Sequence, residues 1–186
     1  MTKARQRPLH PRIVQLGPDT FSKGEPAVVI RPDHKGAVTI VRSTFVRAPA
    51  ERCFEIISKQ LEETPDWDPT VMWVNPVSIK HVRVGSMSRV TFSLDGTTEE
   101  AVAMIRSVKP NRAILWTSNH STQLQEEWQL QPESLGTLIT VTVSYNPRGW
   151  FLGRLTHRIA MRKKVENAVE EMLERLRATV ENRQQV

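Results

Sequence analysis

Residues 137–145 have the sequence TLITVTVSY, and this stretch decides the predicted fold together with the residues that follow it. Its apolar and aromatic side chains occupy every second position, which is the pattern of a strand with one buried face. These side chains are Ile139, Val141, Val143 and Tyr145. The turn-forming segment Asn146-Pro147-Arg148-Gly149 then interrupts the alternation. The strand therefore ends there, and a different element begins near Trp150.

After this turn the apolar side chains recur at intervals near three and four residues, which is the period of a helix. The stripe consists of Leu152, Leu155, Ile159, Val165, Val169, Met172, Leu176 and Val180. Its length predicts a helix of about 30 residues, or roughly 45 Å at 1.5 Å per residue. Such a long apolar stripe must be buried, and the preceding strands are the surface that can bury it.

Seven strands and two short helical segments are predicted ahead of this helix. A helix with Cys53 in its buried stripe follows the first strand, and Cys53 is interpreted as a small core residue rather than a nucleophile because no His lies nearby in sequence. A further helical turn over 58–63 and a rigid, irregular segment from Pro65 to Pro69 come next. The strands are expected at 37–46 and at about 71–81, 86–94, 98–108, 113–119, 123–131 and 137–145. Their short connections favour an antiparallel meander.

The composition narrows the class of protein. The 186 residues include a single cysteine, which excludes an intramolecular disulfide framework and a multi-cysteine zinc site. No apolar run approaches the ~18 residues of a membrane-spanning helix, and the basic start lacks the apolar stretch of a secretory signal, so we expect the cytoplasm. Residues 1–36 hold five of the twelve prolines. They predict a basic, Pro-rich and poorly ordered extension, followed by one domain over residues 37–186.

The formal net charge of +6 is concentrated at the two ends, since residues 1–36 and residues 148–186 each carry a net +4. Basic ends can make a weak contact with an anionic membrane. Nucleic acid is a less favoured partner, because no aromatic residues interleave the basic ones as a stacking platform would need. The pattern does not specify an oligomeric state.

Four local sequences carry a family resemblance by their order and spacing. They are Val46–Ile57 (VRAPAERCFEII), Pro65-Asp66-Trp67-Asp68-Pro69, the stretch from Ile105 to Trp116, and the turn at 146–149 with the helix that follows. Together they resemble the SRPBCC superfamily, which includes START-type lipid carriers, and in particular its polyketide cyclase/dehydrase branch. The resemblance covers about residues 37–182.

The resemblance implies an α+β helix-grip fold in the order β-α-α-β6-α. In this fold a seven-stranded curved antiparallel sheet surrounds the long C-terminal helix. A cavity between sheet and helix is expected to hold an apolar small molecule.

Glu126 is the one catalytic candidate. Strand alternation places it on the same face as Leu124, Trp128 and Leu130, where a carboxylate costs free energy unless it is paired or neutral. We therefore expect a raised pKa and a role as ligand anchor or general acid/base. The alternative is a position turned to water or an ion pair with Arg106 or Arg89.

Large apolar side chains are expected to line the cavity, although each of them could instead fill the core. The ligand-binding candidates are Trp67, Trp73, Phe92, Met104, Trp116, Trp128 and Tyr145. No metal or cofactor is predicted, because the five histidines are scattered and no nucleotide-binding or metal-binding signature is present.

Three functions remain open at this point. The favoured one is binding or carriage of a lipid, a quinone or a polyketide-like molecule. An enzyme of the cyclase/dehydratase type would use Glu126 as its acid/base group. A scaffold module with basic ends is the third. Two or more polar groups converging deep in the cavity would favour the enzyme, a smooth apolar cavity the carrier, and a filled one the scaffold.

Overall fold

The structure is a computed structural model that describes residues 37–59, 61–77, 82–94, 96–119, 123–146 and 155–183. Its elements are β1 (Val38–Val46), α1 (Ala50–Lys59), the 3-10 turn η1 (Leu61–Glu63), α2 (Thr64–Trp67), β2 (Val71–Pro76), β3 (Met87–Leu94), β4 (Thr97–Lys109), β5 (Ala113–Ser118), β6 (Gln125–Glu133), β7 (Gly136–Tyr145) and α3 (Leu155–Asn182). The order of strands and helices confirms the sequence prediction. The predicted extension over residues 1–36 lies outside the described residues.

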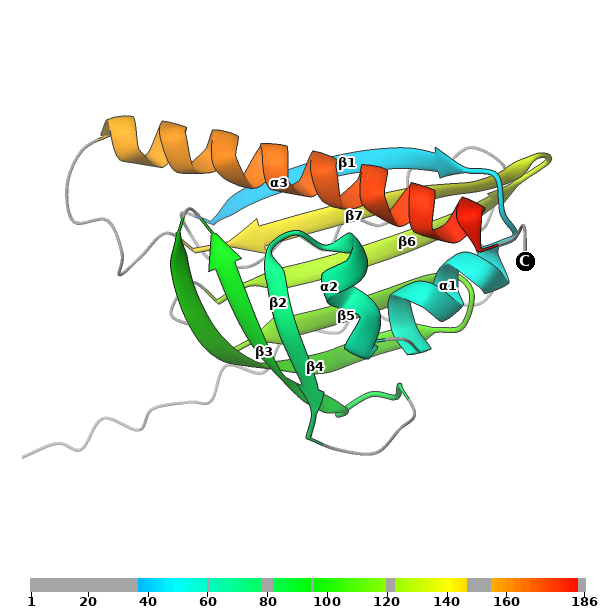
Figure 1. Cartoon of the computed structure of the whole chain (residues 1–186), viewed down its shortest axis with the longest axis horizontal. Helices are drawn as coiled ribbons and strands as arrows, with labels where there is room; N and C mark the ends of the chain where they lie inside the picture. The colour runs from blue at the N-terminus through cyan, green and yellow to red at the C-terminus, as the bar shows by residue number, and fades with distance from the viewer. Residues whose placement is uncertain are drawn as a thin grey trace, which may run out of the picture. The chain divides into compact units, whose positions relative to one another are not determined.

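All seven strands form one antiparallel sheet with the order β1-β7-β6-β5-β4-β3-β2. Strands β2 to β7 are a meander in which each strand pairs with the next, and β1 pairs with β7 at the far edge. Figure 1 shows β2 and β3 running steeply across the direction of β6 and β7, so the sheet is curved. Together with the long C-terminal helix α3, it makes the helix-grip fold that was expected.

The sheet face toward α3, called the inner face below, carries the hydrophobic core. Strand residues of this face and helix residues of α3 belong to one buried cluster, which includes Trp128, Ile139, Val141, Val169, Met172 and Leu176. The alternation in β7 and the stripe in α3 thus meet each other, which is why these two patterns decide the fold. The first members of the predicted stripe, Leu152, Leu155 and Ile159, have no described side chains.

The short helices extend the same core. Cys53 in α1 is fully buried, which confirms its predicted role as a core residue, and burial raises the pKa of its thiol. Of the segment predicted to be irregular, residues 65–67 instead belong to the single helical turn α2, with Pro65 in its first turn, whereas Asp68 and Pro69 follow the helix. The prediction was wrong for residues 65–67 because the N–H groups in the first turn of a helix have no acceptor within the helix. Proline, which lacks this N–H group, therefore fits there.

Two register irregularities interrupt the sheet. The first lies between Val71 and Trp73 in the β2–β3 pairing, and the second between Ile105 and Ser107 in the β4–β5 pairing. An extra residue in one strand reverses the facing of the side chains around it. These two positions decide which of the predicted site residues reach the inner face.

Candidate functional site

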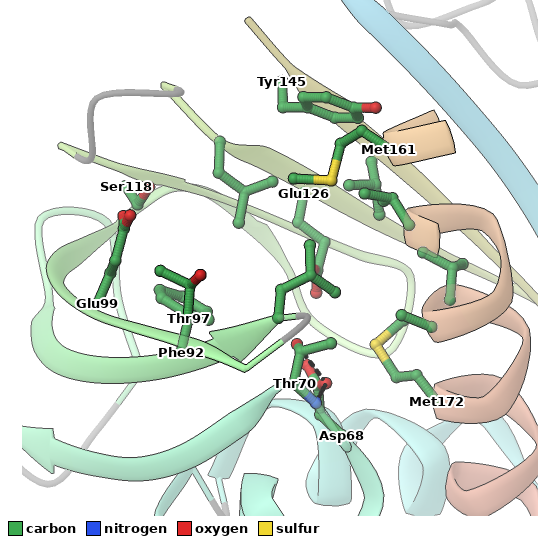
Figure 2. A pocket seen from close by; sticks show the side chains of 16 residues that line it. Asp68, Thr70, Phe92, Thr97, Glu99, Ser118, Glu126, Tyr145, Met161 and Met172 are labelled. Carbon is green, nitrogen blue, oxygen red and sulfur yellow. Dashed lines mark hydrogen bonds between the residues drawn. The ribbon is translucent and has the colours of Figure 1, made fainter. Parts of the chain in front are cut away.

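A cavity of about 140 Å³ lies between the inner face of the sheet and α3. Its walls come from β3 to β7, from the connection between α2 and β2, and from α3 (Figure 2). The apolar part of the lining includes Phe92, Leu124, Val143, Val165, Val169 and Met172. Exposed Thr97 belongs to the same lining, so the cavity reaches the surface near the β3–β4 hairpin.

Glu126 lies on the inner face of β6 and lines this cavity. Its side chain is only 6% exposed, although Leu124 beside it on this face is only partly buried. The indole Nε1–H of Trp128 donates a hydrogen bond of 2.5 Å to Oε1 of Glu126, and a further side-chain hydrogen bond joins Trp116 to Glu126. The carboxyl therefore has neutral hydrogen-bond donors as neighbours.

The alternative for Glu126, a side chain turned to water or paired with Arg89 or Arg106, does not match this burial. Both arginines are exposed. Arg106 lies at the second register irregularity, and its Nε donates to Oγ1 of Thr117 at 2.9 Å.

Asp68 is a second buried carboxyl group in the same cavity, and the sequence analysis did not nominate it. It follows α2 directly and is 5% exposed. Its Oδ1 accepts hydrogen bonds from the backbone N–H of Thr70 at 2.8 Å and from Oγ1 of Thr70 at 2.7 Å. This Asx-type turn was the available signal, since Asp followed two residues later by Thr favours such a turn. The turn motif says nothing about burial, which comes from α3 packing over it.

The two carboxyl groups influence each other. Burial raises the pKa of Glu126 to about 8, and the nearby charge of Asp68 adds to the rise, while the bonds from Trp128 and Trp116 oppose it. Burial also raises the pKa of Asp68, against the hydrogen bonds from Thr70. In Figure 2 the Glu126 carboxyl points toward Asp68 and Thr70. At neutral pH the pair therefore holds a proton, and a protonated carboxyl can donate a hydrogen bond or a proton.

The other predicted site residues divide into four groups, of which three lie in or next to the cavity and the core. Phe92 and Tyr145 line the cavity together with Glu126. Trp116 does not line the cavity itself, but its ring stacks on that of the lining residue Phe92, with the ring centroids 6.5 Å apart. Trp67 and Trp128 are core residues in an edge-to-face pair at 5.8 Å.

Trp73 and Met104 do not line the cavity. Trp73 is 50% exposed, because the register irregularity after Val71 turns both Met72 and Trp73 outward. Met104 alternates with Ala103 and Ile105, which pack toward the core, so it lies on the outer face of the sheet. Their assignment as ligand-binding residues is therefore corrected.

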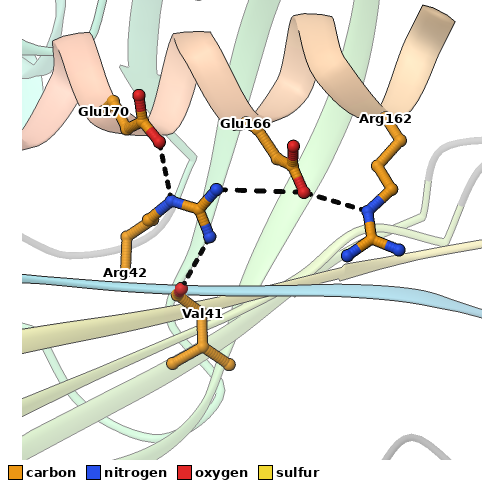
Figure 3. Close-up of polar contacts among 5 residues, drawn as sticks. All are labelled: Val41, Arg42, Arg162, Glu166 and Glu170. Atoms are coloured by element: carbon orange, nitrogen blue, oxygen red, sulfur yellow. Dashed lines mark hydrogen bonds and ion pairs between the residues drawn. The ribbon is translucent and has the colours of Figure 1, made fainter. Parts of the chain in front are cut away.

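A polar network ties the cavity-lining half of α3 to the sheet (Figure 3). Arg42 on β1 donates from Nε to Glu170 at 2.8 Å, and its Nη2 lies 3.8 Å from Glu166. Glu166 also accepts from Nε of Arg162 at 2.9 Å. These contacts surround the turns of α3 that carry Met161 and Val165, and so they position one wall of the cavity.

Within the described parts of the chain, no group of His, Cys, Asp or Glu has the arrangement of a metal site. None of the helices described is long and apolar enough to cross a membrane.

The curved sheet, the long helix α3 packed against it and the cavity between them are the features of an SRPBCC protein. The profile of the family "polyketide cyclase / dehydrase and lipid transport" matches residues 37–181, and the chain belongs to this family. No curated protein matches the sequence.

Solved structures with the same fold come from diverse sources. The Zhui aromatase/cyclase from Streptomyces sp. R1128 has a TM-score of 0.68 at 16% identity and covers 79% of this chain and 95% of its own. A protein of Thermus thermophilus has a TM-score of 0.66 at 20% identity, covering 77% and 97%. A START superfamily protein from Mycobacterium smegmatis has a TM-score of 0.64 at 16% identity, again covering 77% and 97%. At such identities these structures establish the fold alone.

Proposed function

We propose that this domain binds and carries an apolar small molecule, such as a lipid, a quinone or a polyketide-like compound, in the cavity between the sheet and α3. The observation that carries the proposal is the mainly apolar wall of this cavity, interrupted by a few buried polar groups. Small-molecule sites are built in this way, with apolar area for affinity and few polar groups for orientation. The family description, which includes lipid transport, and the START neighbour support it.

Two alanines of α3 allow a matched test of this site. Ala168 lines the cavity, whereas Ala178 is exposed on the same helix. Ala168→Phe should fill the cavity and abolish saturable binding of an apolar fluorescent probe. Ala178→Phe adds the same side chain outside the cavity and should leave binding unchanged.

Binding is measured by quenching of tryptophan emission, for which Trp128, bonded to the lining residue Glu126, and Trp116, stacked on the lining residue Phe92, are reporters. Native mass spectrometry of protein purified from its own host, followed by denaturing extraction, should show one bound molecule per chain. A wild-type protein that carries no ligand and binds none of a panel of fatty acids, quinones and aromatic polyketides would contradict the proposal.

A second function, cyclase/dehydratase catalysis, is favoured by one specific observation, the convergence of Asp68 and Glu126 in the cavity. A protonated Glu126 can give its proton to a ketone oxygen while ionised Asp68 accepts a proton from the carbon next to another carbonyl. The resulting carbanion attacks the activated ketone, which forms a carbon–carbon bond and a hydroxyl group. Loss of that hydroxyl with the neighbouring proton then releases water. The neighbour from Streptomyces is an aromatase/cyclase by name.

The variant Glu126→Gln distinguishes catalysis from carriage. If Glu126 is an acid/base group, this variant should bind a linear poly-β-ketone as the wild type does and fail to cyclise it, because glutamine cannot exchange a proton. Glu127→Gln is the matched control, since Glu127 is the next residue of β6, is also buried and does not line the cavity. Equal turnover in wild type and Glu126→Gln would exclude Glu126 as the acid/base group, and absence of turnover by the wild type would exclude the enzyme and leave the carrier.

A further inference from the structure

The cavity lining is acidic as well as apolar. Three carboxylic acids line it, Asp68, Glu99 and Glu126. None of the described lining residues is Lys, Arg or His. A buried carboxyl group without a cation has its charged form disfavoured, and two such groups in one site cannot both ionise freely. Among the described lining residues, none therefore supplies a positive charge for the two buried acids, Asp68 and Glu126.

One positive charge outside the lining acts on Asp68. Arg175 on α3 lowers the pKa of Asp68, yet this effect is smaller than that of burial and of the hydrogen bonds from Thr70. Arg175 itself is half exposed and pairs with Glu171 at 2.5 Å. It therefore does not neutralise the acidic cavity.

Ser118 provides a second, independent observation. Its side chain is 7% exposed and lines the same cavity at the end of β5. Its Oγ has no hydrogen-bond partner among the described residues. A buried hydroxyl without a partner costs free energy, and in native proteins such groups point to a bound molecule or water. Ser118 and Glu126 lie on adjacent strands, β5 and β6.

We propose that the ligand of this cavity is an apolar amine, whose ammonium group lies against Glu126 and Asp68 while its hydrocarbon part fills the apolar lining. This inference rests on the proposed binding function and narrows its ligand class. An ammonium group supplies the missing positive charge and three hydrogen-bond donors, which suit carboxylate and serine oxygens. The carboxylate of a fatty acid would instead be placed beside the negative charge of Asp68 and is disfavoured.

Binding of the amine is coupled to a proton. Because the pKa of Glu126 is about 8 in the empty protein, most molecules hold its proton at pH 7. An adjacent ammonium favours the ionised carboxylate, so the proton is released on binding. The affinity for an amine should therefore rise between pH 6 and pH 8. Among the described residues, the titratable and charged groups around Glu126 are Asp68 before β2, Glu99 on β4, Tyr145 on β7 and, from α3, Arg175 through Asp68.

Three molecules of equal chain length, octylamine, octan-1-ol and octanoate, test the inference by isothermal titration calorimetry on the full chain. We expect octylamine to bind at least about tenfold more tightly than octan-1-ol, as charge-assisted hydrogen bonds do, and octanoate to bind most weakly. Titrations at pH 7 in two buffers of different ionisation enthalpy should report release of close to one proton with octylamine and none with octan-1-ol.

Three variants test whether the amine binds at Glu126 and Ser118. Glu126→Gln should remove the preference for octylamine and the proton release, whereas Glu127→Gln should keep both. Ser118→Ala should weaken octylamine binding if the hydroxyl is a ligand contact. Octan-1-ol or octanoate binding as tightly as octylamine, without proton release, would overturn the inference and leave the proposed carrier function intact. Absence of saturable binding by all three would overturn both.

Discussion

The indole Nε1–H of Trp128 donates a 2.5 Å hydrogen bond to Oε1 of Glu126, two residues before it on the inner face of β6. Such a donor stabilises the ionised carboxylate and so lowers its pKa. Burial acts in the opposite direction and is the largest influence, with the result that the pKa of Glu126 is about 8 rather than near its ordinary 4.5. The hydrogen bond therefore orients the carboxyl without ionising it.

The stability of the protein should fall as the pH rises from about 5 to 8. In this range the unfolded chain releases the proton of Glu126 while the folded chain keeps it, so the folded state binds more protons and loses stability with increasing pH. A rise of the pKa from 4.5 to about 8 corresponds to roughly 3–5 kcal/mol over the whole range. Urea denaturation at several pH values measures the slope.

Glu126→Gln should flatten this pH dependence and should be more stable than the wild type at pH 8, because glutamine has no proton to lose. Glu127→Gln keeps the Glu126 carboxyl and should keep the wild-type slope. An identical slope in wild type and Glu126→Gln would show that Glu126 titrates as it does in water.

Much of the fold could be predicted from the sequence because the decisive patterns are local. The alternation around Val143 and the stripe around Leu176 each specify an element and its buried face. The placement of Glu126 follows from the same alternation, since β6 has no register irregularity at that position. Sequence reasoning therefore succeeded where the side-chain period is unbroken.

The errors and omissions arise where the period breaks or where tertiary packing decides. Regular alternation from buried Val71 would place Trp73 on the same, buried face of β2. An irregularity of one residue in this strand instead turns Trp73 outward. Asp68 lies in a connection whose facing no period predicts, and its burial depends on α3, more than 85 residues later in the chain. The cavity itself depends on how these distant side chains pack, which no local pattern encodes.

Leu176→Ala should be strongly destabilising. Leu176 is fully buried in the main core cluster, so its truncation loses the transfer free energy of the side chain and leaves a cavity. We expect a loss of roughly 2–5 kcal/mol in denaturant titration. Leu135→Ala is the matched control, because Leu135 is 81% exposed between β6 and β7 and should change the stability by less than about 0.5 kcal/mol. Equal effects of the two substitutions would contradict the assignment of the α3 core face.

Gly136→Ala should also be destabilising, for a different reason. A Cβ atom at this position would lie 2.1 Å from the backbone oxygen of Val46, so the β6–β7 hairpin or the end of β1 would have to move. Forced shifts of this kind cost roughly 1–3 kcal/mol. Ser134→Ala in the same hairpin changes an exposed side chain and should have little effect on the midpoint of thermal unfolding. A wild-type midpoint for Gly136→Ala would mean that the close approach relaxes freely.

Removal of residues 1–36 should leave the domain folded. The described core cluster begins at Val46 and ends at Val180, so the residues that bury one another are all retained. The deletion variant should unfold cooperatively, with a midpoint within the ~2–4 °C that corresponds to 1 kcal/mol in a protein of this size. A much larger fall would show that the N-terminal segment packs on the domain.

Arg42→Gln should loosen the cavity-lining half of α3 without unfolding the protein. Arg42 is the only residue of β1 with a described ion pair to α3, and it contacts both Glu166 and Glu170 there. Hydrogen exchange should therefore become faster in residues 161–170 and stay unchanged in residues 172–182, a range that is held by Met172, Leu173, Leu176 and Val180 of the core cluster. Added salt should reproduce part of this effect in the wild type, because exposed ion pairs are screened. Arg177→Gln, which changes an exposed arginine of the same helix, is the control. Equal exchange along α3 in the wild type and Arg42→Gln would show that apolar contacts such as that of Val165 with the core cluster suffice to hold this wall of the cavity.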